Sequence, residues 1–169
     1  MFFISPLFFG FLAAAGALFA ELFVFSFFVE NPAVYSVAAT NTNFVFAAGG
    51  ILFVFLSALL EECLKYTILK QTLASPNSPR QLIVFLVLFN IGFSGLEITF
   101  LILNNPPHTL PTLFHIISVF LLHLTTIFLL GYSLSRQSLK KFVWIALLLA
   151  TLVHFLYNVA IFYQNSLHI

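Results

Sequence analysis

The sequence predicts an all-α protein, a polytopic bundle of about five transmembrane helices that form a single domain over residues 1–169. Hydrophobic residues make up 62% of the chain and charged residues only 7%, whereas soluble domains carry about 25% charged residues. The mean hydropathy is +1.11. The apolar residues also fall into runs of about 20 residues or more, the length that crosses roughly 30 Å of hydrocarbon. This composition suits a surface that faces lipid.

Apolar segments with the length of a membrane span lie at residues 2–28, 44–69, 82–103, 112–134 and 142–163. The breaks between them hold proline or clustered polar residues, which end helices. We expect the segment 2–28 to be a retained span, because it lacks the basic start of a signal peptide and exceeds that peptide's apolar run of about 7–15 residues.

Basic residues predict the orientation of the bundle. Lys70 and Arg80 flank the second break, and Arg136, Lys140 and Lys141 lie in the fourth, whereas the first and third breaks contain no lysine or arginine. In a bundle of five spans the second and fourth breaks lie on one side of the membrane. The positive-inside rule makes that side cytoplasmic, so we expect a cytoplasmic N-terminus and a C-terminus outside.

Charge and cysteine content exclude two classes of function. A formal net charge of +1 provides no clustered basic face, so nucleic acid is not an expected partner. The single cysteine, Cys63, excludes an internal disulfide and a metal cage built from thiolates.

Polar and ionisable residues within the predicted spans are the candidates for function. A charge at the bilayer centre costs at least about 2.5–3.5 kcal/mol, and such residues usually face the interior of the bundle. The spans hold many of them at depth: Glu21, Glu61, Glu62, Lys65, Asn90, Glu97, His115, His123, His154 and Asn158.

The second predicted span contains two adjacent glutamates, Glu61 and Glu62, with Lys65 one turn beyond them. At about 100° per residue, all three lie close to one face of the helix. We expect the lysine to help hold one carboxylate ionised while its stem snorkels towards the cytoplasmic face. An ion pair near the membrane interface is the alternative, but a doubled carboxylate costs more than one pair requires.

The third predicted span carries Asn90, Ser94 and Glu97 at spacings of i, i+4 and i+7, which place them in one polar stripe. Gly92 and Gly95 would let a neighbouring helix approach closely. A polar seam for helix packing is the alternative reading of the stripe, although a carboxylate is an expensive choice for that purpose.

The fourth and fifth predicted spans supply histidines. His154 and Asn158 share a face at i, i+4, and His123 lies near the middle of its span. A lone histidine in a membrane often only bonds a neighbouring helix. Two histidines alongside carboxylates on other helices favour a shared site.

These motifs, taken together, resemble those of the PrsW family of membrane proteases, which belongs to a wider clan with the CAAX-processing and bacteriocin-immunity (CPBP) proteases. The matching residues lie in order on successive predicted spans: Glu61–Lys65, Gly92–Glu97, His123 with Gly131, and His154–Asn158. The resemblance implies an intramembrane endopeptidase of a prokaryotic cell membrane. It also implies a substrate that is a membrane-anchored protein or peptide.

Two forms of hydrolytic site fit these residues. In one, Glu97, His123 and His154 hold a catalytic Zn²⁺ with an open fourth position. In the other, which is metal-free, Glu61 or Glu62 beside Lys65 acts with a histidine to activate water. Asn158, one turn from His154, is the candidate donor to the oxyanion, and in the metal-free form His154 shares that role.

Two other classes of function remain open. The polar residues could lock the helices of an inactive membrane scaffold or an immunity-type binding protein. They could also form a proton relay in a small transporter, although transporters usually show internal repeats and interrupted helices, and the sequence has neither.

Overall fold

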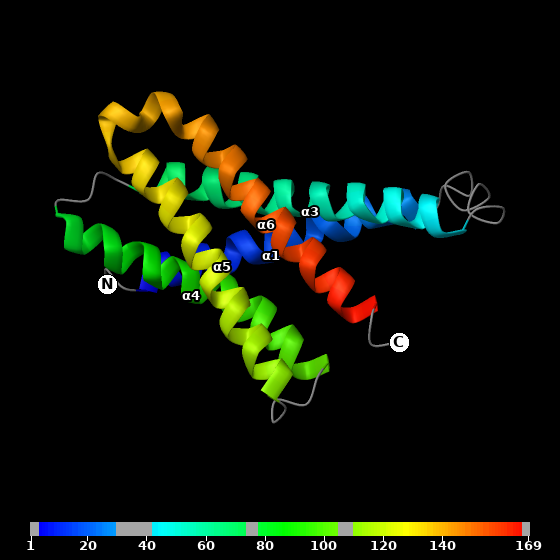
Figure 1. The fold of residues 1–169 in the computed structure, drawn as a ribbon. Helices are drawn as coiled ribbons and strands as arrows, with labels where there is room; N and C mark the ends of the chain where they lie inside the picture. Colours follow the sequence, from blue (N-terminus) through cyan, green and yellow to red (C-terminus); the bar gives the residue numbers. More distant parts are fainter. Residues whose placement is uncertain (1–3, 30–41, 74–77, 105–109, 167–169) are drawn as a thin grey trace.

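The computed structural model describes residues 4–29, 42–73, 78–104 and 110–166, and every regular element in these ranges is a helix. The elements are α1 (Ile4–Val29), α3 (Thr42–Thr72), α4 (Pro79–Asn104), α5 (Leu110–Ser135), the short 3₁₀ helix η2 (Gln137–Phe142) and α6 (Val143–Ser166) (Figure 1). The predicted all-α class is confirmed. The helix bounds agree with the predicted spans to within about three residues, the usual uncertainty of helix ends.

Within the described ranges, α1, α4, α5 and α6 are each long and apolar enough to cross a membrane. Helix α3 is also long, but Glu61, Glu62 and Lys65 interrupt its described apolar part. The chain is therefore an integral membrane protein by composition. Helix α3, the second predicted span, is the one that brings these three charged residues into the bundle.

The long helices close into a ring. Helix α1 contacts α4, α4 contacts α5, α5 contacts α6, α6 contacts α3 and α3 returns to α1, while α3 also contacts α5 across the ring. Large apolar side chains such as Phe19 on α1 and Trp144 and Leu148 on α6 point outwards. Polar side chains such as Lys65 and His123 are buried inside. This inverted arrangement suits a protein whose solvent is hydrocarbon.

Helices α1 and α4 touch backbone to backbone at a pair of glycines. A Cβ added to Gly10 would lie 2.0 Å from the carbonyl oxygen of Phe89, and one added to Gly92 would lie 2.0 Å from that of Leu7. Close approach at Gly92 was expected from the sequence. The same expectation for Gly95 is wrong, because a Cβ there would meet nothing within 4 Å.

The polar stripe on α4 divides into two parts with different roles. The side-chain amide of Asn90 donates to the carbonyl oxygen of Phe120 on α5 at 3.3 Å, and the Ser94 hydroxyl donates to Asn90 at 3.0 Å. Asn90 and Ser94 thus form the packing seam that was the alternative interpretation. Glu97 instead reaches His123, where the ionisable side chains gather.

Candidate active site

Lys65 lies at the centre of a buried cluster of ionisable side chains. Its Nζ lies 2.6 Å from Oε1 of Glu62, 2.9 Å from Nδ1 of His123 and 3.9 Å from Oε2 of Glu61. It also lies 4.3 Å from the centre of the Phe93 ring, which is within the range of a cation–π contact. The expected snorkelling of Lys65 is wrong. The side chain is 0% exposed, because its ammonium group turns inwards to these partners.

The contact with Lys65 determines the tautomer of His123. A lysine ammonium group donates and has no lone pair to accept with, so Nδ1 of His123 must be the acceptor. The proton of the neutral ring therefore lies on Nε2, which is 2.5 Å from Oε2 of Glu97. We assign His123 as the donor to Glu97 on this basis. Both ring nitrogens of His123 are consequently engaged.

His154 is oriented by Glu62. Its Nδ1 lies 2.8 Å from Oε1 of Glu62, and both side chains are almost fully buried. A carboxylate oxygen accepts, so Nδ1 carries the proton and the lone pair of a neutral His154 ring lies on Nε2. A histidine held in one tautomer by a buried carboxylate is the usual arrangement of a catalytic base.

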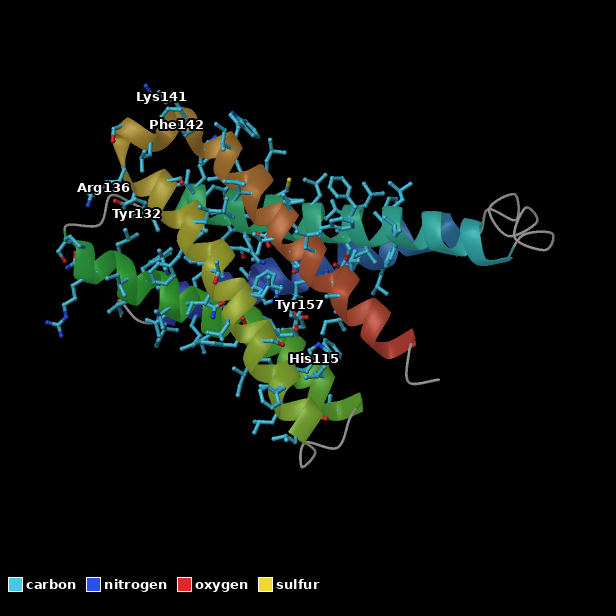
Figure 2. All side chains as sticks on the ribbon, viewed as in Figure 1. His115, Tyr132, Arg136, Lys141, Phe142 and Tyr157 are labelled. Atoms are coloured by element: carbon cyan, nitrogen blue, oxygen red, sulfur yellow. The ribbon has the colours of Figure 1, made fainter. Side chains whose placement is uncertain are left out.

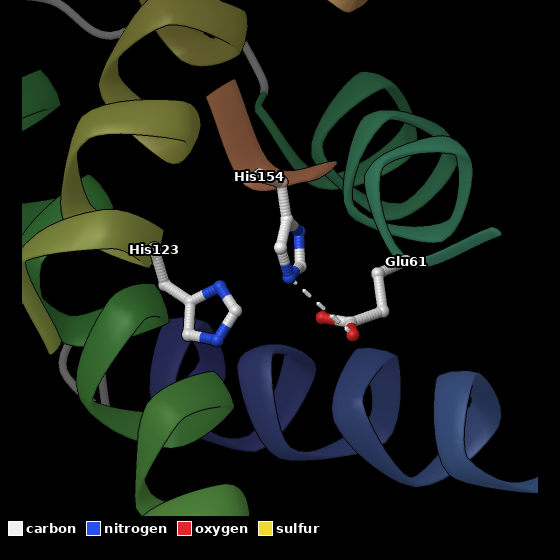
Figure 3. Close-up of side chains that lie close together, drawn as sticks. All are labelled: Glu61, His123 and His154. Carbon is white, nitrogen blue, oxygen red and sulfur yellow. Dashed lines mark ion pairs between the residues drawn. The ribbon is translucent and has the colours of Figure 1, made fainter. Parts of the chain in front are cut away.

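The free nitrogen of His154 faces Glu61. Nε2 of His154 and Oε1 of Glu61 are 3.7 Å apart, too far for a direct hydrogen bond (Figure 3). Oε2 of Glu61 has no hydrogen-bond partner among the described residues. Glu61 on α3, His123 on α5 and His154 on α6 therefore converge on a point where two polar atoms lack a strong partner.

The two adjacent glutamates differ in their access to this point. Glu62 is 0% exposed and is paired with Lys65 and His154, whereas the side chain of Glu61 is 13% exposed. Glu61 lines a cavity of about 210 Å³ that Glu21 and Glu97 also line. The Glu97 side chain is 47% exposed at this cavity. A half-exposed carboxylate inside a span requires water around it, so we interpret the cavity as hydrated.

The sequence assigns no role to Glu21, and the structure places it in the lining of the cavity beside the site. It projects from α1 and accepts a hydrogen bond from the Ser57 hydroxyl on α3. Its carboxylate at depth was the signal, but no spacing within α1 linked it to another motif. Phe93 and Thr126 were also missed as contacts of Lys65, because apolar and hydroxyl residues give no signal of that kind.

Asn158 takes no part in the cluster's contacts. It is half-buried and makes no side-chain hydrogen bond to the residues that the structure describes. Its neighbour Tyr157 forms a hydrogen bond with the Ser118 hydroxyl at 2.8 Å and lies near the His115 ring (Figure 2). These two contacts of Tyr157 join α6 to α5. The other predicted site residues, Glu61, Glu62, Lys65, Glu97, His123 and His154, form one connected set.

The donor atoms that lie together differ from the predicted zinc ligands. Glu61, His123 and His154 each offer one atom within 4.8 Å of the others. Glu97 lies outside this group and contacts His123 directly. A zinc ion would need a free ring nitrogen of His123. Lys65 engages Nδ1 of this ring, and Glu97 engages Nε2. The residues therefore accept a metal only if one of these contacts is broken.

Comparison of the chain with known protein families, curated proteins and solved structures finds no match. Fold and site together define its class: a helical membrane protein with a buried cluster of glutamate, histidine and lysine side chains beside a cavity.

Proposed function

We propose that this protein is a membrane-embedded endopeptidase that hydrolyses peptide bonds of membrane-anchored proteins. Its Glu61 and His154 side chains are the groups that bind and activate the water. The observation that carries the proposal is the gap of 3.7 Å between Oε1 of Glu61 and Nε2 of His154, at the edge of a cavity that Glu61 itself lines. A water molecule beside these atoms would contact two bases at once. The resemblance to PrsW proteases supports the same assignment of residues.

The reaction follows from the positions of these groups. Glu61 takes a proton from the water, whose other hydrogen bonds Nε2 of His154, and the oxygen attacks the carbonyl carbon of the scissile bond. The carbonyl oxygen of the tetrahedral intermediate carries the negative charge, for which Asn158 is the proposed donor. The protonated base then gives its proton to the departing nitrogen as the C–N bond breaks. One water is consumed, and an acid and an amine are released.

Glu62 and Lys65 act as positioning residues in this scheme. Glu62 holds His154 with Nε2 directed at Glu61, and Lys65 offsets the charge of Glu62 at 2.6 Å. Glu62 is already paired with Lys65 and His154, whereas Glu61 lines the cavity, so we assign the role of base to Glu61 rather than to Glu62.

The metal-free form of the mechanism is the one we propose. The ammonium group of Lys65 already occupies Nδ1 of His123, and it would repel a divalent cation at a few ångströms. If zinc does bind, Glu61, His123 and His154 are its proposed ligands, and it would supply an activated water.

An inactive scaffold is the competing function, and the completeness of the Lys65 contacts favours it. The Lys65 ammonium group has carboxylate, imidazole and hydroxyl partners, as a purely structural ion pair would. The position of Glu61 speaks against it. A carboxylate that only joined helices would gain from a close partner, whereas Glu61 lines the cavity and lies 3.7 Å from His154 and 3.9 Å from Lys65.

Co-reconstitution in liposomes tests the proposal. Purified protein is mixed with a panel of single-span membrane proteins, each carrying a tag at both ends, and fragments are identified by mass spectrometry. We expect cleavage by the wild type and none by His154→Ala. The Leu148→Ala variant, altered at an outward-facing residue of α6, should cleave at the wild-type rate. Absence of cleavage across the panel by a folded wild type would contradict the proposal.

A further inference from the structure

A second cavity lies away from the carboxylates, between the start of α4 and the end of α5. Its volume is about 330 Å³. Apolar side chains, including those of Leu82, Ile83 and Phe128, form its walls, whereas Ser78 and Arg136 are polar residues of its lining. The two helix ends splay apart here, with Tyr132 and Arg136 at the end of α5 (Figures 1 and 2).

Helices α4 and α5 pack tightly beside this cavity. A Cβ added to Gly131 of α5 would lie 2.3 Å from the Leu86 side chain of α4, so the helices are in tight contact at this level. Leu86 is 0% exposed and also lines the cavity. Leu86, which belongs to the hydrophobic core, therefore forms the inner wall of this cavity, which we call the groove.

The charge around the opening is of one sign. Arg136 lines the cavity, and Arg80 is exposed in the first turn of α4. The sequence has no aspartate or glutamate between residues 63 and 96 or after Glu97. Arg136 packs over the Tyr132 ring at 5.6 Å and forms no salt bridge within the described part of the chain.

We propose that this groove binds an anionic phospholipid. The phosphate lies against the Arg136 guanidinium and the Ser78 hydroxyl, and an acyl chain lies along Ile83 and Phe128. The Ser78 oxygen accepts from the backbone nitrogen of Gln81 at 3.2 Å, which leaves its proton free for a phosphate oxygen. Apolar walls under a cationic rim, at the end of membrane-spanning helices, match a lipid better than a soluble anion.

Native mass spectrometry of the detergent-solubilised protein with equal amounts of phosphatidylglycerol and phosphatidylcholine tests the assignment. We expect the wild type to bind phosphatidylglycerol about fivefold more strongly than phosphatidylcholine, because one cation near the membrane surface strengthens the binding of an anionic lipid by about that factor. Arg136→Gln should lose that preference. Lys70→Gln, which removes a cation from the same end outside the groove, should keep it.

A second variant separates a lipid from a free phosphate group. Ile83 is 50% exposed, so Ile83→Trp should fold while filling the acyl groove. We expect it to weaken phosphatidylglycerol binding, and we expect millimolar inorganic phosphate not to displace the lipid from the wild type. Equal retention of the two lipids, or unchanged binding in both Arg136→Gln and Ile83→Trp, would overturn the proposal. Displacement by inorganic phosphate would overturn it in favour of a simple anion site.

Discussion

The Nζ atom of Lys65 lies 2.9 Å from Nδ1 of His123, and both side chains are fully buried. This contact joins α3 to α5 across the ring of helices, and it selects the tautomer in which His123 donates to Glu97. A lysine in the second predicted span thus determines, through His123 in the fourth, how the Glu97 carboxylate in the third is held. The ion pair that the sequence suggested is therefore part of a larger network of hydrogen bonds.

The Lys65–Glu62 pair should be strongly coupled. Lys65→Met leaves the buried Glu62 carboxylate without its nearest cation, and loss of one partner of a buried pair typically costs about 3–5 kcal/mol. Glu62→Gln should cost a similar amount. The double variant Lys65→Met/Glu62→Gln should be less destabilised than the sum of the single variants. A chemical or thermal unfolding series in detergent checks this, and simple additivity would contradict the pairing.

The contact between α1 and α4 should not accommodate a methyl group in place of either glycine hydrogen. We expect Gly10→Ala or Gly92→Ala to destabilise the bundle by about 1–3 kcal/mol or more, because each new Cβ would meet backbone that has no freedom to move aside. Gly95→Ala is the matched control in the same helix. It meets open space and should be neutral or stabilising by up to about 1 kcal/mol through helix propensity. Similar stabilities for Gly92→Ala and Gly95→Ala would refute the close crossing.

Zinc binding should depend on Lys65. The wild type, purified without chelators, should contain well under one zinc per chain, because Lys65 and Glu97 engage both nitrogens of His123. Lys65→Met frees Nδ1 and removes the competing positive charge, so it should bind zinc more tightly. Elemental analysis and zinc titration provide the measurement. A wild type with one tightly bound zinc, lost in His154→Ala, would require the metal-dependent form of the site.

The basic breaks predict a cytoplasmic N-terminus and a C-terminus outside. Single cysteines at Ser75, Asn105 and Gln137, in a Cys63→Ala background, report the side of each break by reaction with an impermeant reagent. We expect Asn105 to react from outside and the other two only after permeabilisation. Labelling of Asn105 from the cytoplasm would reverse the orientation.

The sequence predicts the helices well, because about 20 apolar residues and polar breaks are strong local signals. It also identifies most of the site, since charge in a span is costly wherever it points. It cannot assign partners across helices. Lys65 turns inwards, and Glu61 rather than Glu97 lies beside His154, because of the way each helix is rotated about its axis. No local sequence pattern predicts that rotation. Gly10 gave no signal either, because its role depends on Gly92 facing it.

The division of roles between the adjacent glutamates is the central claim, and one paired comparison tests it most directly. Cleavage rate and thermal stability are measured for Glu61→Gln and Glu62→Gln in the same membrane preparation, with a substrate that the wild type cleaves. Glu61→Gln should lower the rate by about 100- to 10,000-fold while stability is unchanged or raised, because it removes a base that lines the cavity and has no close ion-pair partner among the described residues. Glu62→Gln should lower stability as well as rate. Wild-type cleavage by Glu61→Gln, or a clear loss of stability in that variant, would contradict the account.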